Sequence, residues 1–337
     1  MSKYNKEPLD FVMKTMQDDP VLSITKATRI MCEHFEIEYT DNVRRAMSNL
    51  LSARSFTDNV PEEVSELFEE AKKKKLDKKK DTFIISWAQN ATPIHKNLMK
   101  NIEAYAGSLN AGIHIVAGRY SNPTSIFTDK DKDWWSPKVT PYLDAARHNL
   151  HKNLQVLSDV KIPPTGSTPL SGLNSVTGLE SCIVGHPRQQ VKSLPILDGY
   201  PHKLLLSTGA VTIANYTDSK SGKKGEFHHS LGFVIVELDG EHFHIRQVSA
   251  DDKGNFYDLF KRVKNGVVSE NEEGCEVAVL GDIHIAHNDN KATALSFDLL
   301  DKMKPNHTMI HDIIDCESIS HHEENDPFRI MQKEENG

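Results

Sequence analysis

Two aspartates and a histidine follow apolar segments in the last quarter of the chain. Asp282 and His284 come directly after the apolar run 277–280, and Asp312 follows the apolar run 308–310. Two carboxylates at close range repel each other and raise each other's pKa, and a divalent cation between them removes that cost. The residue types therefore indicate a metal site, provided that the fold brings the two segments together.

The residues between these segments predict how they are brought together. Leu295, Leu299 and Met303 recur at helical spacing in KATALSFDLLDKM, which predicts a helix between two strands. Such a unit is parallel and delivers both strand ends to one edge of the sheet. The unbroken apolar run 277–280 predicts a parallel strand covered on both faces, and Gly281 would permit a tight turn after it.

An imidazole beside carboxylates favours manganese, iron or zinc over magnesium or calcium. We therefore expect the site to bind a divalent metal, with Mn²⁺ as the favoured ion and iron or zinc as alternatives. A bridging aspartate could hold two ions roughly 3.5–4 Å apart, which is an arrangement used for phosphoester hydrolysis. Further candidate ligands lie nearby at His311, Asp315, His321 and His322.

This order of motifs, Asp-x-His and then Asp-x-x-Asp after the next strand, resembles the calcineurin-like metallophosphoesterases. In that family the first Asp and His bind one metal and the leading Asp of the second motif bridges two, which implies these roles for Asp282, His284 and Asp312. The family's usual Gly before that Asp is His311 here, and no Asn-His-Asp follows Asp315. The resemblance thus implies only the first part of such a domain. We expect weak or no nuclease activity from a truncated chain, unless a second chain or a homo-oligomer completes the site.

The wider chain resembles phage proteins of the first-step DNA-transfer class. The segments that carry this resemblance are ISWAQNATPIH, WWSPKVTPYLD, TGLESCIVGHP, YTDSKSGKKGEFHHSLGFVIVE, GDIHIAH and SHHEENDPF. It spans most of residues 80–330 and implies metal-dependent degradation of host DNA, or genome entry, with DNA as partner and the host cytoplasm as location.

Composition agrees with a cytoplasmic protein. The 337 residues include four widely separated cysteines, which favours reduced thiols, and no stretch approaches the roughly 20 apolar residues of a membrane span. The beginning, MSKYNKEPLD, lacks the apolar core of a secretory signal. A net charge of −8 argues against a generally basic nucleic-acid coat but leaves room for a local basic patch.

We predict an α/β protein in four parts. Residues 1–55 form a small helical unit that is helix-turn-helix-like, with Ser23 as a cap and Arg44 and Arg45 facing outward; an ordinary helical hairpin is the alternative. Residues 56–81 are a charged helix or linker, 82–272 a mixed α/β domain, and 273–337 the first βαβ part of a metallophosphoesterase domain.

Within 82–272 the sequence predicts a strand at 83–85, a helix, and a parallel strand at 113–116, followed later by a β-hairpin around Asp239-Gly240. Polar residues beyond the first strand could hold a ligand or could satisfy the backbone of their own loop: Ser86, Gln89, Asn90 and Thr92. The stretch 217–229 is expected to be a flexible basic loop, where Lys223 and Lys224 could contact phosphate.

A metal-dependent phosphoesterase acting on DNA is the favoured function. The alternative is a non-catalytic DNA-binding or scaffold protein of phage infection, suggested by Arg44, Arg45 and the lysine run 72–80. A nucleotide-handling activity within 83–270 ranks last, because no Walker A or Gly-x-Gly-x-x-Gly pattern supports it.

Overall fold

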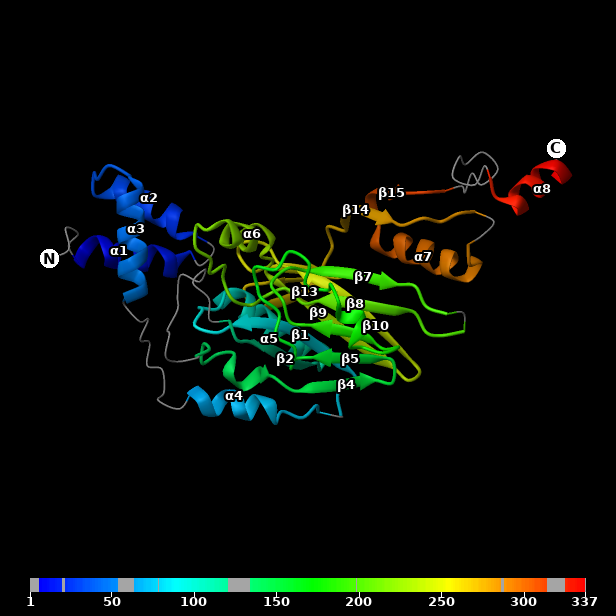
Figure 1. Cartoon of the computed structure of the whole chain (residues 1–337), viewed down its shortest axis with the longest axis horizontal. Helices are drawn as coiled ribbons and strands as arrows, with labels where there is room; N and C mark the ends of the chain where they lie inside the picture. The colour runs from blue at the N-terminus through cyan, green and yellow to red at the C-terminus, as the bar shows by residue number, and fades with distance from the viewer. Residues whose placement is uncertain are drawn as a thin grey trace. The chain divides into compact units, whose positions relative to one another are not determined.

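A computed structural model describes residues 6–19, 22–53, 64–77, 79–120, 134–197, 199–285, 288–313 and 325–336. The chain divides into two compact units (Figure 1). The first comprises residues 1–258 and 262–269, and the second residues 259–261 and 270–337. Each unit is described by itself, and the division into four predicted parts stays a prediction.

The helices are α1 (Lys6–Asp18), α2 (Ile24–His34), α3 (Asp41–Ala53), α4 (Val64–Lys72), α5 (Lys96–Leu109), α6 (Lys220–His228), α7 (Asn290–Met303) and α8 (Pro327–Asn336). The strands of the first unit's two large sheets are β1 (Thr82–Gln89), β2 (Gly112–Gly118), β3 (Leu143–Asp144), β4 (Arg147–His151), β5 (Leu154–Leu157), β6 (Ser181–Val184), β7 (Gln190–Leu194), β8 (Lys203–Ser207), β9 (Gly232–Asp239) and β10 (His242–Ser249). The remaining strands are β11 (Phe256–Asp258), β12 (Lys261–Lys264), β13 (Val267–Glu270), β14 (Cys275–Leu280) and β15 (Pro305–Ile310).

The N-terminal helices α1, α2 and α3 pack around one apolar cluster that includes Val12, Met31 and Met47, all fully buried. Ser23 is the N-cap of α2, as predicted, and its side chain accepts the backbone N–H of Lys26. Three helices, rather than two, thus build this part of the chain, because residues 6–18 also present an apolar face.

The first large sheet has the strand order β10-β9-β1-β2-β3. The predicted βαβ unit is confirmed, since β1 and β2 pair in parallel and α5 connects them. The predicted hairpin is also confirmed, since β9 and β10 pair antiparallel around a Gly240 with positive φ. One face of this sheet packs on α5, where Ile84 and Ile102 are buried in a shared cluster.

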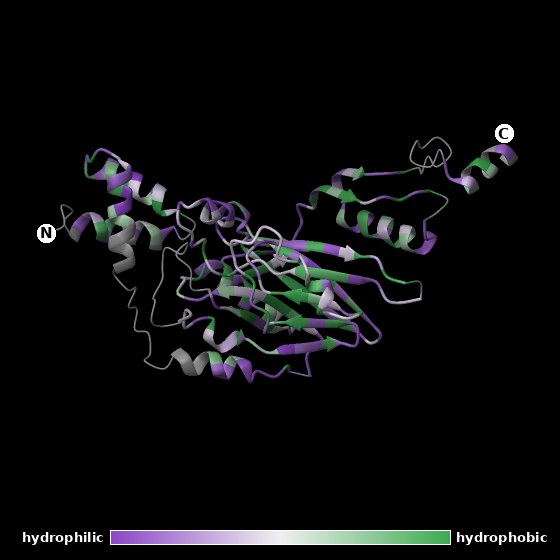
Figure 2. Ribbon diagram, viewed as in Figure 1, coloured by the Kyte–Doolittle hydropathy of each residue, from purple (hydrophilic) through white to green (hydrophobic). Residues whose placement is uncertain are grey.

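The other face of the first sheet packs against the second large sheet, whose strand order is β4-β5-β6-β8-β7. Side chains of both sheets meet in one apolar cluster, to which Ile85 and Trp87 of β1 and Val156 of β5 contribute. Because β1 is covered on both faces, its sequence TFIISWAQ is nearly continuous in apolar residues. Figure 2 shows hydrophobic residues along the strands of these two sheets.

The stretch 217–229 is not a flexible loop, so that prediction was wrong. Residues 220–228 form α6, and the Ser219 side chain caps this helix by accepting the Gly222 backbone N–H. Gly222 and Gly225 are buried against the neighbouring residues Thr217 and Tyr216, and a methyl group on either glycine would collide with them. Close packing therefore accounts for glycines that resemble loop residues in the sequence.

The second unit contains the predicted strand-helix-strand segment. The strands β14 and β15 pair in parallel, with Val277 opposite His307 and Leu280 opposite Ile310, and α7 connects them. The expectation that β14 is covered on both faces was wrong, because Val279 is 70% exposed and the described sheet has only two strands. Leu295 and Leu299 of the predicted apolar stripe are exposed as well, and Leu300 is the buried residue of α7.

Among the described helices, none is long and apolar enough to cross a bilayer.

Candidate metal centre

Hydrogen bonds beyond the two strand ends hold the predicted ligands side by side. The backbone N–H groups of Ile283 and His284 donate to the carbonyl oxygen of Asp312, at 2.7 and 3.3 Å, and the N–H of Ile285 donates to Ile313 O at 2.8 Å. The segments that follow β14 and β15 therefore stay paired after the regular strands end. This pairing places Asp282, His284 and Asp312 at one edge of the sheet, as the parallel arrangement predicts.

The turn after β14 is made at the histidine rather than at the glycine. His284 has a φ of +48°, in the left-handed region. Gly281 is absent from the residues of positive φ, and a methyl group added to it would meet open space. The prediction that Gly281 permits the turn was therefore wrong. A left-handed residue with a side chain stores backbone strain, and such strain is concentrated at functional sites.

The ligand atoms of Asp282, His284 and Asp312 all lie within 4.8 Å of one another. Two ligands that each sit about 2.1 Å from one ion are at most about 4.2 Å apart, so small side-chain movements would close the set around a cation. Asp282 and Asp312 are 53% and 57% exposed, so solvent rather than packed side chains surrounds much of each carboxylate. Two carboxylates and one imidazole form a donor set suited to a divalent transition ion.

His311 belongs to the same group of side chains. Its Nδ1 is 2.7 Å from Asp282 Oδ1 and 3.4 Å from Asp312 Oδ2. The hydrogen bond with Asp282 and the charges of Asp312 and Asp282 raise the pKa of His311. The other oxygen of Asp282, Oδ2, faces His284 Nε2 at 4.0 Å. The two oxygens of Asp282 therefore face two different imidazoles.

The roles of these residues as metal ligands stay predictions. Asp315, His321 and His322, the further candidates, lie outside the residues that the structure describes.

The basic residues proposed to contact DNA are largely engaged within the protein. Arg44 forms ion pairs with Asp41 and with Asp218, and Arg45 pairs with Asp41 at 3.5 Å. Lys223 is 3.0 Å from Asp218 and 2.7 Å from Glu226. Lys224 is exposed on α6. Carboxylates thus already neutralise Arg44, Arg45 and Lys223, which weakens a phosphate-binding role for them.

Two of the four polar residues predicted to lie beyond the first strand, Ser86 and Gln89, belong to β1 itself, and Asn90 and Thr92 follow it. Ser86 donates to Gly232 O at 2.7 Å, and Thr92 donates to Asn90 O at 3.0 Å. Asn90 accepts the Tyr120 N–H at 2.7 Å. Ser86, Asn90, Thr92 and Gln89 are all buried, so they are part of the folded interior rather than of an open ligand site.

A buried His-Asp-His cluster was missed by sequence analysis. Asp144 Oδ2 is 2.8 Å from His114 Nδ1 and 2.7 Å from His148 Nε2, and Asp144 Oδ1 accepts the Ala146 N–H at 2.9 Å. Their ligand atoms also lie within 4.8 Å of one another. Burial opposes ionisation of Asp144, but the hydrogen bonds from His114 and His148 outweigh burial and hold its pKa below the usual value. Both carboxylate oxygens thus have partners within the protein, and we interpret the cluster as a structural network.

A signal for this cluster exists in the sequence. His114 interrupts the apolar strand GIHIVAG, and its side chain is 6% exposed. A polar residue in a strand that is covered on both faces must find a buried partner. The partner cannot be identified from spacing, because Asp144 is brought to β2 only by the pairing of β2 with β3.

Comparisons with known proteins support a phage context for the chain. It is similar to Protein A1 of Escherichia phage T5, at 29% identity over an alignment of 259 residues that covers 71% of this chain. The chain spans 46% of the length of that relative. No family model matches. Among solved structures, Vps29 of Chaetomium thermophilum aligns with 52% of this chain and 94% of its own, at 9% identity and a TM-score of 0.26, a similarity too weak to define a shared fold.

Proposed function

We propose that this chain is a phage protein of the DNA-transfer class. Its second unit binds a divalent metal, with Mn²⁺ as the preferred ion, and contributes to hydrolysis of phosphodiester bonds in DNA. The observation that carries the proposal is the convergence of Asp282, His284 and Asp312 at the carboxyl edge of β14 and β15. Similarity to a phage T5 protein supports the phage origin, and with it action in the host cytoplasm.

Each side chain would have a distinct task. Asp282 Oδ2, His284 Nε2 and a carboxylate oxygen of Asp312 would hold the ion. His311 would act as a positioning residue, because its hydrogen bond to Asp282 Oδ1 orients the carboxylate, as outer partners of metal ligands commonly do. The ion would supply Lewis-acid stabilisation of the negative charge that develops on the phosphate.

Efficient hydrolysis would require more groups than these. Asp282 and Asp312 are more than half exposed, whereas active sites that polarise a phosphate are enclosed and exclude water. Exposed apolar residues border the same segments, including Ile285 at 57% and Ile313 at 46%. We therefore propose that another polypeptide segment, from a second chain or from a homo-oligomer, covers this edge and adds ligands. By itself the chain is expected to be weakly active or inactive.

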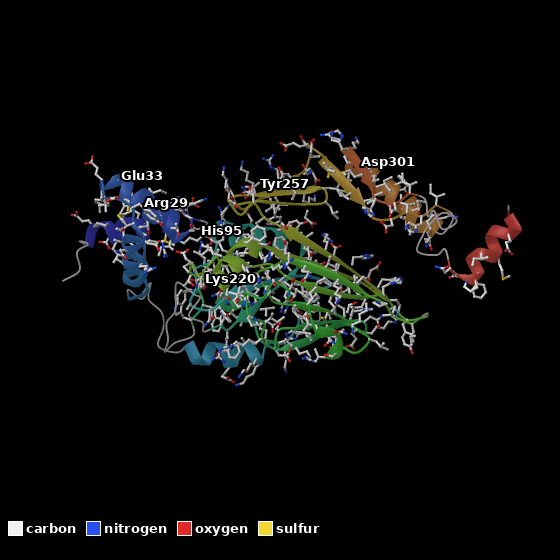
Figure 3. The ribbon with its side chains drawn as sticks, turned by 45° about the horizontal axis from the view of Figure 1, so that its top comes forward. Arg29, Glu33, His95, Lys220, Tyr257 and Asp301 are labelled. Carbon is white, nitrogen blue, oxygen red and sulfur yellow. The ribbon has the colours of Figure 1, made fainter. Side chains whose placement is uncertain are left out.

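The experiment measures Mn²⁺ binding by calorimetry and metal-dependent cleavage of duplex DNA with the intact chain. Asp282→Asn and Asp312→Asn should each weaken binding at least tenfold, because each replaces a charged ligand by a neutral one. Asp301→Asn is the matched control: Asp301 is exposed on α7 of the same unit (Figure 3) and should leave binding unchanged. Cleavage or Mn²⁺ binding that survives Asp282→Asn would refute the proposed function.

The non-catalytic alternative, a DNA-binding or scaffold protein, was suggested by Arg44, Arg45 and the lysine run 72–80. The ion pairs of Arg44 and Arg45 with Asp41 and Asp218 reduce the charge available to DNA phosphates. Retention of duplex DNA that decreases steeply with salt and is lost in Arg45→Ala would favour this alternative instead.

A further inference from the structure

One face of α6 carries two lysines and an aromatic ring (Figure 1). Lys220, Lys224 and Phe227 follow one another at intervals of four and three residues, which places them on the same side of the helix. All three are exposed, and we call them the outer face of α6. The opposite side carries the buried Gly222 and Gly225, whose lack of side chains lets the helix lie close against the rest of the first unit. The outer face is thus held toward solvent by the packing beneath it.

The two lysines of the outer face are not explained by contacts within the protein. Lys223, between them, is engaged by two carboxylates. Lys220 and Lys224 form no ion pair with any residue that the structure describes. Lys220 also lies in the first turn of α6, which contains no acidic residue. Because a helix N-terminus carries partial positive charge, a cation there is unfavourable for the helix. An anion from outside the protein would offset this cost.

A nearby arginine adds to the positive charge at this helix. Arg188 donates to the backbone carbonyl of Ser167, which is a neutral acceptor and leaves the charge of the guanidinium in place. Burial, and then the charges of Arg188 and Lys224, lower the pKa of His228 at the end of α6. Positive charge therefore gathers around the outer face, although the chain as a whole carries a charge of −8.

Phe227 is more exposed than packing would explain. It is 84% exposed, which is the highest value among the large apolar residues that the structure describes. Its ring meets the ring of His228 at 75°, with the centroids 5.0 Å apart. Proteins that bind single-stranded nucleic acid combine such an aromatic ring, on which a base stacks, with cations that contact the phosphates. The outer face contains both components within two turns of helix.

The composition of the outer face distinguishes between possible anionic partners. The bases of a duplex are stacked on one another, so their faces are not available to Phe227. A helix that binds a membrane surface presents a row of apolar residues, whereas Phe227 is the only large apolar residue of α6. An acidic peptide would pair with the lysines but would leave the exposed ring unexplained. A single strand accounts for both the charge and the ring.

We propose that the outer face of α6 binds a single-stranded nucleic acid, with backbone phosphates at Lys220 and Lys224 and one base stacked on the ring of Phe227. These residues belong to the first unit, whereas the candidate metal centre belongs to the second. Failure of this binding would therefore leave the proposed metal site untouched, and failure of the metal site would leave this binding untouched.

Fluorescence anisotropy with the intact chain tests this inference, using labelled oligo-dT and oligo-rU of about 15 nucleotides. EDTA is included so that no metal contributes. Phe227→Ala should weaken binding by about fivefold to a hundredfold, the range expected for the loss of one stacked base. Phe227→Leu should weaken it as much, and Phe227→Tyr should retain most of the affinity because it keeps the ring. Leu197→Ala is the matched control, since Leu197 is 75% exposed in the same unit and should not affect binding.

The salt dependence of binding tests the two lysines. Lys220→Gln and Lys224→Gln should each reduce the slope of log affinity against log salt by about 0.7, because each removes one phosphate contact. Lys192→Gln, at an exposed position on β7, is the matched control and should keep the slope of the parent. All the substituted side chains are exposed, so each variant should unfold at the temperature of the parent. Loss of binding in a variant of unchanged stability supports the site.

Several results would overturn the inference. They are no binding of either oligonucleotide at low salt, Phe227→Leu binding as tightly as the parent, and Leu197→Ala weakening binding as much as Phe227→Ala. Tighter binding of a duplex of the same length would also refute it, because a paired base cannot stack on Phe227. Phe227-dependent binding of anionic lipid vesicles without binding of oligonucleotides would identify a membrane surface as the partner instead. Competition by polyglutamate as strong as that by unlabelled oligo-dT would reduce the site to a general anion-binding face and refute it as well.

Discussion

Removal of the buried carboxylate of Asp144 should destabilise the first unit strongly. Asp144 has no exposed surface and accepts hydrogen bonds from His114, His148 and the Ala146 backbone. Asp144→Ala would leave two buried imidazoles without their shared partner. Breaking a buried charged network in this way costs about 3–5 kcal/mol of the free energy of unfolding. Asp159→Ala is the matched control, because Asp159 is 42% exposed and pairs with Arg147 at the surface, where an ion pair contributes about 0–1 kcal/mol.

Urea denaturation followed by tryptophan fluorescence measures this difference, since all three tryptophans belong to the first unit. The pH dependence provides a second test. The pKa of Asp144 is lowered in the folded state, so its stabilisation is complete above the unfolded pKa of about 3.9 and is lost as the pH falls through the lower folded value. The contribution of the Asp144 carboxylate to the stability gap between parent and Asp144→Ala should therefore decrease as the pH falls below about 4. An Asp144→Ala variant no less stable than Asp159→Ala would refute the structural interpretation of this cluster.

Three further substitutions test other contacts. Arg246→Ala should cost about 3–5 kcal/mol in urea unfolding, because it leaves the 4%-exposed Asp258 without the guanidinium that contacts both of its oxygens at 2.6 and 2.8 Å. Gly118→Ala should cost about 1–3 kcal/mol and shift the tryptophan emission, since the new methyl group would lie 2.4 Å from the Trp87 indole; an unchanged spectrum and midpoint would contradict the packing. His284→Ala should speed amide exchange in β14 more than His284→Asn, because Asn tolerates the left-handed φ of +48°, whereas equal exchange would argue against strain there.

The parts of the fold that depend on contacts between neighbouring segments of the chain could be predicted from the spacing of apolar residues. The βαβ units around α5 and α7 and the hairpin at Gly240 follow from strand and helix periodicity and from turn residues. The meeting of Asp282 with Asp312 was predictable for the same reason, because a single parallel crossover determines it.

Features that depend on distant contacts were not predictable. The stretch that forms α6 resembles a loop because Gly222 and Gly225 have low helix propensity, and only their close contacts with Thr217 and Tyr216 explain them. The burial of β14 was overestimated because an apolar run does not reveal how many strands and helices will cover it.

The small parallel pair formed by β14 and β15 carries a thermodynamic consequence. Two strands and one helix, with Leu300 as the buried apolar residue of that helix, supply little burial to hold the strands together. If this segment binds the proposed ion, the free energy of ion binding also stabilises the ordered segment, so ordering and binding promote each other. A polypeptide that binds to the face of this pair where Val279 is exposed would then increase the affinity for the ion, even if it contributed no metal ligand. The bound ion would in turn increase the affinity for that polypeptide.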